Sequence, residues 1–184
     1  GAIVARDVYS EEEVPSFRRS MVDGYAVLAG DVAAAGESVP VILDLIGEVK
    51  MGEDSGLSVS PGQCVYVPTG GAIPEGADAM VMIEYTDKIG GTKISVFQSV
   101  AAGAYVVRIG EDVAKGDLIV KKGTYIRPQT IGMLCATGHE KIEIYEPLQI
   151  AVISTGDELV SIGEIPRAGQ MRDVNTHTIS AQAT

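Results

Sequence analysis

The sequence is poor in aromatic residues, in histidine and cysteine, and in positive charge. Its 184 residues include no Trp, two Phe, two His and two Cys, and 14 Lys and Arg stand against 25 Asp and Glu. The core must therefore be built from aliphatic side chains. The net charge of −11 argues against general binding to a nucleic-acid backbone. It also repels phosphate-bearing small molecules unless a metal ion or local donors intervene, although solubility is the simplest account of the charge.

The spacing of the cysteines and the shortness of the apolar runs argue against further classes of protein. Cys64 and Cys135 are far apart, and no Cys-x-x-Cys spacing indicates a zinc site or a redox motif. Both lie in apolar contexts, so we expect two buried thiols in a reducing compartment. No apolar run approaches the roughly 20 residues of a membrane span, and no signal peptide is visible. We therefore expect a cytoplasmic location and no membrane partner.

Glycine and proline, by contrast, are abundant. The 22 Gly and eight Pro favour short strands separated by turns over a helical bundle. A hairpin is predicted at Asp87–Thr92, because its Gly-Gly pair accepts positive φ angles. Several short strands at this spacing are typical of a small barrel or sandwich. The predicted strands are 39–49, 63–67, 80–85, 93–97 and 117–120.

Two helices are predicted in the second half of the chain. The first begins at Pro128, which suits the first helical position, and ends at Gly138. Its buried face would carry Ile131, Leu134 and Cys135. The second follows a cap at Asp173–Thr176.

The stretch Leu148–Val160 joins an apolar run to a polar cluster. The run Ile150–Ile153 predicts a strand buried on both faces, as in a parallel α/β sheet. Ligands bind beyond the carboxyl ends of such strands, and here the residues that follow are Ser154–Glu158. Thr155 and Glu158 also fit a capping box, so a helix start is the alternative. Because the chain stops about one helix later, we expect it to be a piece of a larger protein.

A second polar cluster surrounds Asp23. The Asp23-Gly24 pair before an apolar strand is first of all a turn signal. The functional alternative is that Asp23 projects a carboxylate from a rigid turn. Ser20, Arg18 and Arg19 would then be neighbours for a polar or anionic ligand.

Two further clusters are weaker signals. Thr69, Gly70 and Gly71 follow a strand, and amides flanked by glycine can approach an anion closely. This segment is no P-loop, because no Gly-Lys-Ser/Thr follows, and a tight loop is the alternative. Residues Gly110–Asp117 hold three acids and a lysine, which suit a hard cation or a solvated turn.

Taken together, four motifs in this order resemble one family. They are Ser-x-x-Asp-Gly-Tyr-Ala at Ser20–Ala26, Thr-Gly-x-x-x-Pro-x-Gly-Ala-Asp at Thr69–Asp78, Gly-x-Asp at Gly110–Asp112, and Ser-Thr-Gly-Asp-Glu-Leu at Ser154–Leu159. Over essentially its whole length the chain is similar to the MoeA-type molybdopterin molybdenumtransferases and the gephyrin E domain.

The resemblance implies molybdenum cofactor biosynthesis. Family members insert molybdate into adenylylated molybdopterin with Mg²⁺ and release AMP. By position, the catalytic residues would be Asp23, Thr69, Asp112 and Glu158. The substrate-binding residues would be Ser20, Gly70, Thr155, Gly156 and Asp157. The carboxylates that would hold Mg²⁺ are Asp23, Asp112 and Glu158.

The resemblance also implies an architecture and a partner. The expected fold is α+β and mostly β, with a barrel-like β-rich domain over 15–108. Residues 1–14 and 109–146 would form a small mixed α/β linker domain, and 147–184 the truncated start of a parallel α/β domain. Family members are homodimers whose site lies between the β-rich part of one subunit and the α/β part of the other.

Two other functions stay open at this point. The fragment alone is expected to be inactive, because half of each cleft would be absent. The alternative to an enzyme is a non-catalytic scaffold or partner-binding module of the gephyrin type, since a fold does not fix a function. A plain acidic β domain that binds a cation without a pterin nucleotide is the third reading.

Overall fold

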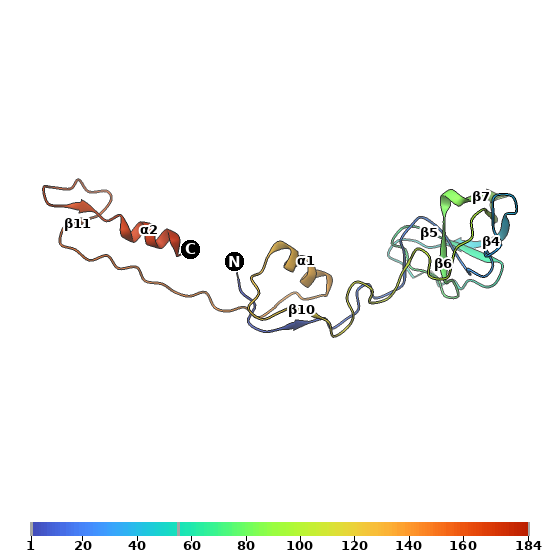
Figure 1. Ribbon diagram of the computed structural model, residues 1–184, viewed down its shortest axis with the longest axis horizontal. Coiled ribbons are helices and arrows are strands. Elements are labelled where there is room, and N and C mark those ends of the chain that lie inside the picture. Colours follow the sequence, from blue (N-terminus) through green and yellow to red (C-terminus); the bar gives the residue numbers. More distant parts are fainter. Residues whose placement is uncertain (1, 55, 184) are drawn as a thin grey trace. The chain divides into compact units, whose positions relative to one another are not determined.

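The computed structural model describes residues 2–54 and 56–183. The chain divides into two units, residues 3–144 and residues 145–184. As predicted, the fold is mostly β with short strands and two α-helices (Figure 1). The helices of the first and second unit are α1 (Pro128–Ala136) and α2 (Asn175–Gln182). No helix in residues 2–54 and 56–183 is both long enough and apolar enough to cross a membrane.

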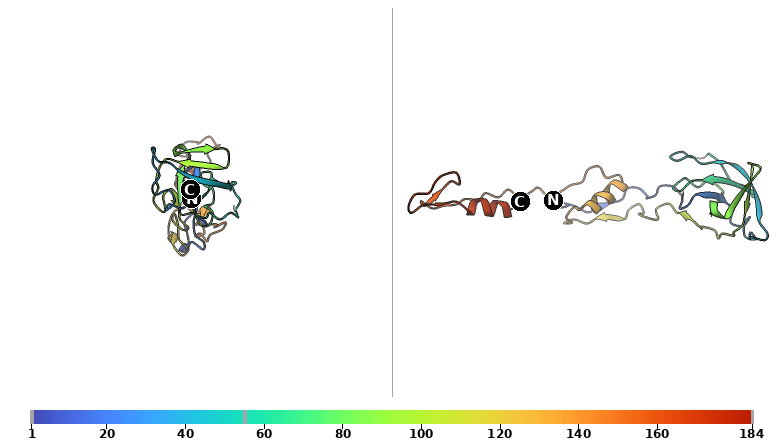
Figure 2. Two further views of the ribbon diagram at one scale, coloured as in Figure 1. Left: turned by 90° about the vertical axis from the view of Figure 1, so that its right-hand side faces the viewer. Right: turned by 90° about the horizontal axis from the view of Figure 1, so that it is seen from above.

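The first unit is built on a six-stranded sheet. Its strands are ordered β6-β3-β5-β4-β8-β7 and curl into a half-barrel (Figure 2). The 3₁₀ helix η1 (Ile83–Tyr85) joins the two edge strands along the chain. The bounds are β3 Gly24–Val27, β4 Val41–Glu48, β5 Gln63–Val67, β6 Ala79–Met82, β7 Thr86–Ile89 and β8 Lys93–Val96.

All neighbours in this sheet are antiparallel except β4 and β5, which run parallel. Residues 49–62 therefore cross from the end of β4 back to the start of β5. The β7–β8 hairpin turns at Gly90 and Gly91, whose φ angles are 57° and 81°. Two consecutive positive φ angles define the mirror-image turn that matches strand twist, so the predicted hairpin is confirmed.

The sheet is buried on both faces where it carries the site. Along β3, Tyr25 and Val27 face one core cluster while Ala26 faces another, as the two-residue period of a strand requires. β5 and β6 alternate in the same way. The first cluster also contains Leu43, Cys64 and Ile94, and the second contains Val65, Val67 and Met80. Apart from Tyr25 and Cys64, these two clusters consist of aliphatic side chains and Met80, as the composition predicts.

Four shorter strands complete the first unit. The strands are β1 (Val8–Tyr9) with β10 (Leu118–Val120), and β2 (Arg19–Ser20) with β9 (Val106–Val107), each an antiparallel pair. Helix α1 lies beside β10 (Figures 1 and 2), and its Leu134 joins a third core cluster with residues of β1 and β10. Pro128 is the first helical residue, and Gly138 has a φ of 75° beyond the helix end.

The buried face predicted for α1 was too wide. Leu134 is buried, but Ile131 is 52% exposed and Cys135 is also exposed. A nine-residue helix on a small two-stranded ribbon has room to bury only one large side chain. The expectation of two buried thiols is thus wrong for Cys135 and confirmed for Cys64.

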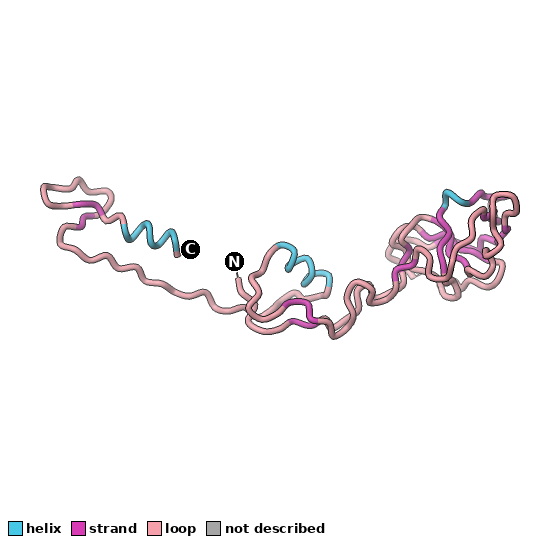
Figure 3. Tube along the Cα trace, in the orientation of Figure 1, coloured by secondary structure: helices cyan, strands magenta, loops and turns pink. Residues whose placement is uncertain are grey.

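The second unit has little regular structure. It contains one parallel pair of two-residue strands, β11 (Leu159–Val160) and β12 (Met171–Arg172), followed by α2. The segment between α1 and β11 is drawn as loop (Figure 3). None of residues 145–183 is buried.

The predicted strand at Ile150–Ile153 is wrong. These residues have no regular structure, and Ile150 and Ile153 are 62% and 82% exposed. A strand is defined by hydrogen bonds to a neighbouring strand, and residues 150–153 pair with no strand in the described part of the chain. The division of residues 1–146 into two domains, with a third from 147, stays a prediction.

Candidate functional site

The Asp23 side chain projects from a turn between β2 and β3. Ser20 is 2% exposed. Its hydroxyl donates to the Val22 carbonyl oxygen at 2.6 Å and accepts from the Val22 amide at 3.2 Å. The Ile83 amide donates to the Asp23 carbonyl oxygen at 3.0 Å. The turn is thus fixed by its own hydrogen bonds and by the first residue of η1, so the exposed Asp23 carboxylate projects from a rigid backbone.

Gly24 is required directly after Asp23. A Cβ atom at this position would lie 2.0 Å from the Val81 carbonyl oxygen. Gly24 pairs with both Val67 of β5 and Met82 of β6. The motif therefore needs glycine so that β3 can approach its neighbour, in addition to the turn preference that the sequence indicates.

The second motif meets the first. The Thr69 amide donates to Asp23 Oδ1 at 2.8 Å. The Gly70 amide donates to the Ser20 carbonyl oxygen at 2.8 Å, and the Ser20 amide donates back to Gly71 at 2.9 Å. Gly70 has a φ of 81°, which glycine adopts without a steric penalty. The structure therefore brings together four predicted site residues: Ser20, Asp23, Thr69 and Gly70.

Asp112 is tied to the same place through Arg19. The Arg19 Nη2 atom lies 3.3 Å from Asp112 Oδ2. The backbone of Arg19 pairs with Val107 in the β2–β9 ribbon and forms a bridge to Ala72. Arg19 thus touches the segments of three of the four motifs. Arg19 Nε is buried and has no hydrogen-bond partner among the described residues.

The two arginines proposed as neighbours of an anionic ligand are already engaged. Arg19 pairs with Asp112, as described above. The guanidinium of Arg18 donates to the carbonyl oxygens of Ala77 at 2.9 Å and Pro74 at 3.4 Å. The negative charge of the site therefore has little free positive charge beside it, which increases the need for a cation.

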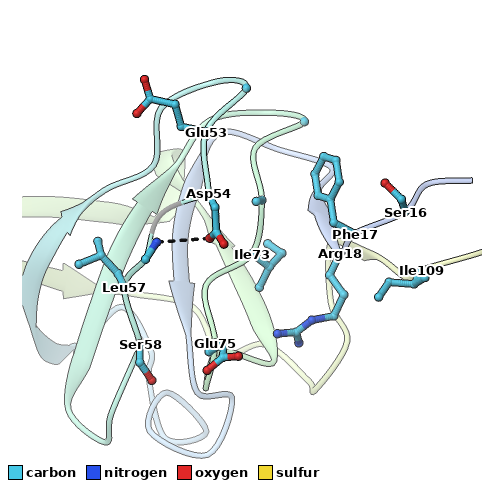
Figure 4. Close-up of a pocket in the computed structure, with 14 residues that line it drawn as sticks. Ser16, Phe17, Arg18, Glu53, Asp54, Leu57, Ser58, Ile73, Glu75 and Ile109 are labelled. Atoms are coloured by element: carbon cyan, nitrogen blue, oxygen red, sulfur yellow. Dashed lines mark hydrogen bonds between the residues drawn. The ribbon is translucent and has the colours of Figure 1, made fainter.

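A cavity of about 670 Å³ borders Gly70. Phe17, Ile73 and Leu57 supply apolar walls, and Figure 4 shows Arg18 extending past Ile73. The charged side chains around it are Glu53, Asp54, Glu75 and Arg18. Three carboxylates against one engaged guanidinium disfavour a bare phosphate. The lining favours a ligand that combines apolar surface with hydrogen-bond donors.

The fourth motif lies in the second unit, just before β11. The Leu159 amide donates to the Gly156 carbonyl oxygen at 3.1 Å, which closes a turn over Asp157 and Glu158. The Glu158 carboxylate lies over Gly156, because a Cβ there would be 2.6 Å from both carboxylate oxygens. The capping-box alternative for Thr155 and Glu158 is wrong: a turn and β11 follow, and α2 begins only at Asn175.

Carboxylate oxygens fit the coordination preference of Mg²⁺. Asp23 Oδ2 and Asp112 Oδ1 have no hydrogen-bond partner in residues 2–54 and 56–183. No group of three His, Cys, Asp or Glu side chains is gathered for a metal ion within those ranges. Mg²⁺ commonly takes only one or two carboxylates and completes its shell with water and substrate phosphates. The donor set is therefore compatible with a metal shared with a substrate.

Two side chains outside the predicted site residues have shifted pKa values. Burial, and to a smaller extent the Asp44 charge, raises the pKa of the Cys64 thiol to about 12, so Cys64 is an inert core residue. Hydrogen bonds from the Thr176 side chain and backbone, and then from Ser154, lower the pKa of Asp173. Sequence reasoning identified Asp173 only as part of a helix cap, and it did not predict the Arg19–Asp112 pair.

Comparison with known proteins identifies the family. The model of the MoeA N-terminal region, domain I and II, matches residues 1–138. The chain belongs to this family. The MoeA resemblance seen in the four motifs is thereby confirmed.

Relatives and solved structures agree with this assignment. The chain is 34% identical over 196 residues to molybdopterin molybdenumtransferase 1 of Mycobacterium tuberculosis, and 34% over 183 residues to the molybdopterin molybdenumtransferase of Bacillus subtilis. It matches a molybdopterin biosynthesis MoeA protein of Pyrococcus horikoshii with a TM-score of 0.92 and 35% identity, covering 100% of this chain and 48% of that one. Each of the two enzymes matches 98% of this chain, which spans 46% and 43% of their lengths.

Proposed function

We propose that the protein acts in molybdenum cofactor biosynthesis as a molybdopterin molybdenumtransferase. At the length of its relatives it would insert molybdate into adenylylated molybdopterin and release AMP. The observation that carries this proposal is the hydrogen bond from the Thr69 amide to Asp23 Oδ1 at 2.8 Å. This hydrogen bond joins the first two motifs at one exposed point. The cavity beside it is lined by apolar side chains and carboxylates.

Each motif residue has a proposed role. Asp23 and Asp112 each keep one carboxylate oxygen for Mg²⁺, and Glu158 would add a third ligand. Mg²⁺ held by these carboxylates would supply positive charge that reduces the repulsion between the acidic site and the substrate phosphates. The Thr69 hydroxyl and the Gly70 loop would contact the substrate. Ser20 would support them through the turn, because its hydroxyl is committed to Val22.

The cavity beside Gly70 would take the pterin ring. A pterin is flat and carries amino and ring N–H donors. Phe17 and Ile73 offer apolar surface to its faces, and Glu75 and Asp54 offer acceptors at its edge. The phosphates would lie outside the cavity, toward Asp23, where a cation offsets their charge.

We also propose a homodimer in the cytoplasm. The motif with Thr155, Gly156, Asp157 and Glu158 belongs to a different unit from Asp23 and Thr69. In the family architecture that the sequence resembles, the two halves of a site come from different subunits. A second copy of the chain would supply the half that complements Asp23.

The test uses a protein of family length that contains this chain. With adenylylated molybdopterin, molybdate and Mg²⁺, Asp23→Ala is expected to reduce molybdenum insertion about 100-fold, since it removes a charge that acts on the reacting groups. Asp31→Ala is the matched control, because Asp31 Oδ2 also accepts one backbone N–H, from Gly62 at 2.7 Å, away from the site. An unchanged rate in Asp23→Ala would overturn the catalytic role of Asp23, whereas no insertion by the unmodified protein would favour the scaffold alternative.

A further inference from the structure

A polar network in the second unit joins the fourth motif to the start of α2. The Ser154 hydroxyl donates to Asp173 Oδ1 at 2.9 Å, and the Thr176 amide donates to the same oxygen at 3.0 Å. The Thr176 hydroxyl donates to Asp173 Oδ2. The two hydroxyl oxygens are 2.7 Å apart. Nineteen positions separate Ser154 from Asp173, so the network closes a long loop.

The network leaves no hydroxyl proton unused. Each hydroxyl has one proton, and Asp173 as a carboxylate can only accept. Whether Ser154 donates to Asp173 directly or through Thr176, the chain of donors ends on the same carboxylate. Removing that acceptor leaves both hydroxyls without their partner, and hydrogen bonds to a charged group are the stronger kind.

Backbone hydrogen bonds near Asp173 anchor the C-terminal end of the fourth motif. The Met171 amide donates to the Glu158 carbonyl oxygen at 2.8 Å, and the Asp173 amide donates to Val160 at 3.0 Å. Ser154 is thus held by the Asp173 side chain, whereas Glu158 is held by Met171 of β12 and Val160 by the Asp173 amide. The loop that carries Thr155, Gly156 and Asp157 lies between these two anchors.

Apolar packing does not fix this loop. None of residues 145–183 is buried, so no apolar core holds it in place. We propose that Asp173 is a positioning residue that holds the Ser154–Glu158 loop in the conformation needed by the molybdenum-insertion site. This inference rests on the proposed function for its consequence in catalysis, whereas its structural part stands on the contacts alone.

The structural part is tested by amide hydrogen exchange on the 184-residue chain at pH 7. Asp173→Asn is expected to raise the exchange of the Leu159 and Met171 amides at least about tenfold, because charged hydrogen bonds are lost. Glu164→Gln is the matched control. It makes the same change of charge in the same unit, and its contact is with Ser161 at 3.1 Å.

Ser154→Ala separates loop anchoring from helix capping. It removes the hydroxyl of the loop but keeps the hydrogen bonds between Asp173 and Thr176. The Leu159 amide should then exchange faster, while the Thr178 amide, which donates to Val174 at 3.0 Å in α2, should not change. If Leu159 exchanges at the wild-type rate in both Asp173→Asn and Ser154→Ala, Asp173 does not position the loop. This holds even if Asp173→Asn unfolds α2, because Ser154→Ala leaves the cap intact.

The catalytic part is tested at family length. Asp173→Asn should lower kcat for molybdenum insertion about tenfold and raise the Mg²⁺ concentration for half-maximal rate, because Glu158 is displaced. Adding Ser154→Ala should cost little more, since residues of one network are not additive. Faster loop exchange with unchanged kcat would overturn the catalytic use of the loop, whereas no insertion by the unmodified protein would overturn the proposed function itself.

Discussion

The motifs that carry Asp23 and Glu158 are held by different physical means. Asp23 follows a turn that β3, β5 and η1 fix through backbone hydrogen bonds, over a sheet buried on both faces. Glu158 lies in a loop held by a short parallel pair and by the side chain of Asp173. The first motif draws its rigidity from a core and the second from polar contacts. Substitutions in the core should therefore disturb the Asp23 motif most, and substitutions of polar side chains should disturb the Glu158 motif most.

The largest effect is expected from Gly24→Ala. The new Cβ would meet the Val81 carbonyl oxygen at 2.0 Å, so the backbone of β3 or β6 must move. We expect a loss of about 4 kcal/mol or more in the free energy of unfolding, the range that marks a severe packing fault. Urea unfolding followed by circular dichroism measures it.

The control for this substitution is Gly30→Ala. A Cβ at Gly30 would have no atom within 4 Å, and its φ is not positive. Equal stability of the two variants would show that β3 does not approach β6 as closely as the structure indicates.

A smaller but clear difference is expected between Met80→Ala and Ile153→Ala. Met80 is fully buried beneath the Asp23 turn, in the cluster that contains Ala26 and Val67. Its truncation should cost about 3 kcal/mol. Ile153 is 82% exposed, and its truncation should change stability by less than about 0.5 kcal/mol.

This pair also tests the strand that sequence analysis expected. Both variants are measured by urea unfolding followed by far-ultraviolet circular dichroism, and for Met80→Ala the Tyr25–Tyr66 ring contact at 5.7 Å adds a near-ultraviolet reporter of the core. A cost above about 1 kcal/mol for Ile153→Ala would mean that Ile150–Ile153 is buried after all.

The smallest effect is expected when the pH is lowered. Hydrogen bonds from Thr176 and Ser154, and the charge of His177, lower the pKa of Asp173 below its ordinary value. Stabilisation by a carboxylate of this kind is complete above the ordinary pKa of about 4 and is lost as the pH falls through the lowered one. Protection of the Met171 amide should therefore be constant from neutral pH to about pH 4 and fall several-fold below it.

Asp173→Asn should abolish this dependence, because an amide does not titrate. The Tyr25 amide in β3 is the internal reference within the same sample. Equal acid sensitivity of the Met171 and Tyr25 amides would contradict the distinction between a unit held by its core and a unit held by a carboxylate.

The first unit could be predicted in most of its parts from the sequence. Strand β5 was predicted with its observed bounds, 63–67, and the Gly90-Gly91 hairpin was found because local backbone preference decides it. Pro128 and Gly138 likewise marked the ends of α1. These features depend on residues that are neighbours in the sequence, so they can be predicted without a structure.

The failures have a common physical cause. The run Ile150–Ile153 has the composition of a buried strand, but a strand needs partners that composition cannot supply. The Arg19–Asp112 pair spans 93 positions and the Ser154–Asp173 pair spans 19, and neither spacing has a local signature. The four motifs indicate the family of the chain and its candidate site residues. Only the structure shows which side chains hold those site residues in place.

The parallel pairing of β4 and β5 has a consequence for how the family can diverge. Parallel neighbours oblige residues 49–62 to cross from one end of the sheet to the other, and this crossing supplies Glu53, Asp54 and Leu57 to the wall of the cavity. Connecting segments tolerate changes of length with little thermodynamic cost. Insertions there would reshape the cavity without moving Thr69 or Asp23. The selectivity of the cavity for its ligand can therefore change between family members while the turn that carries Asp23 stays the same.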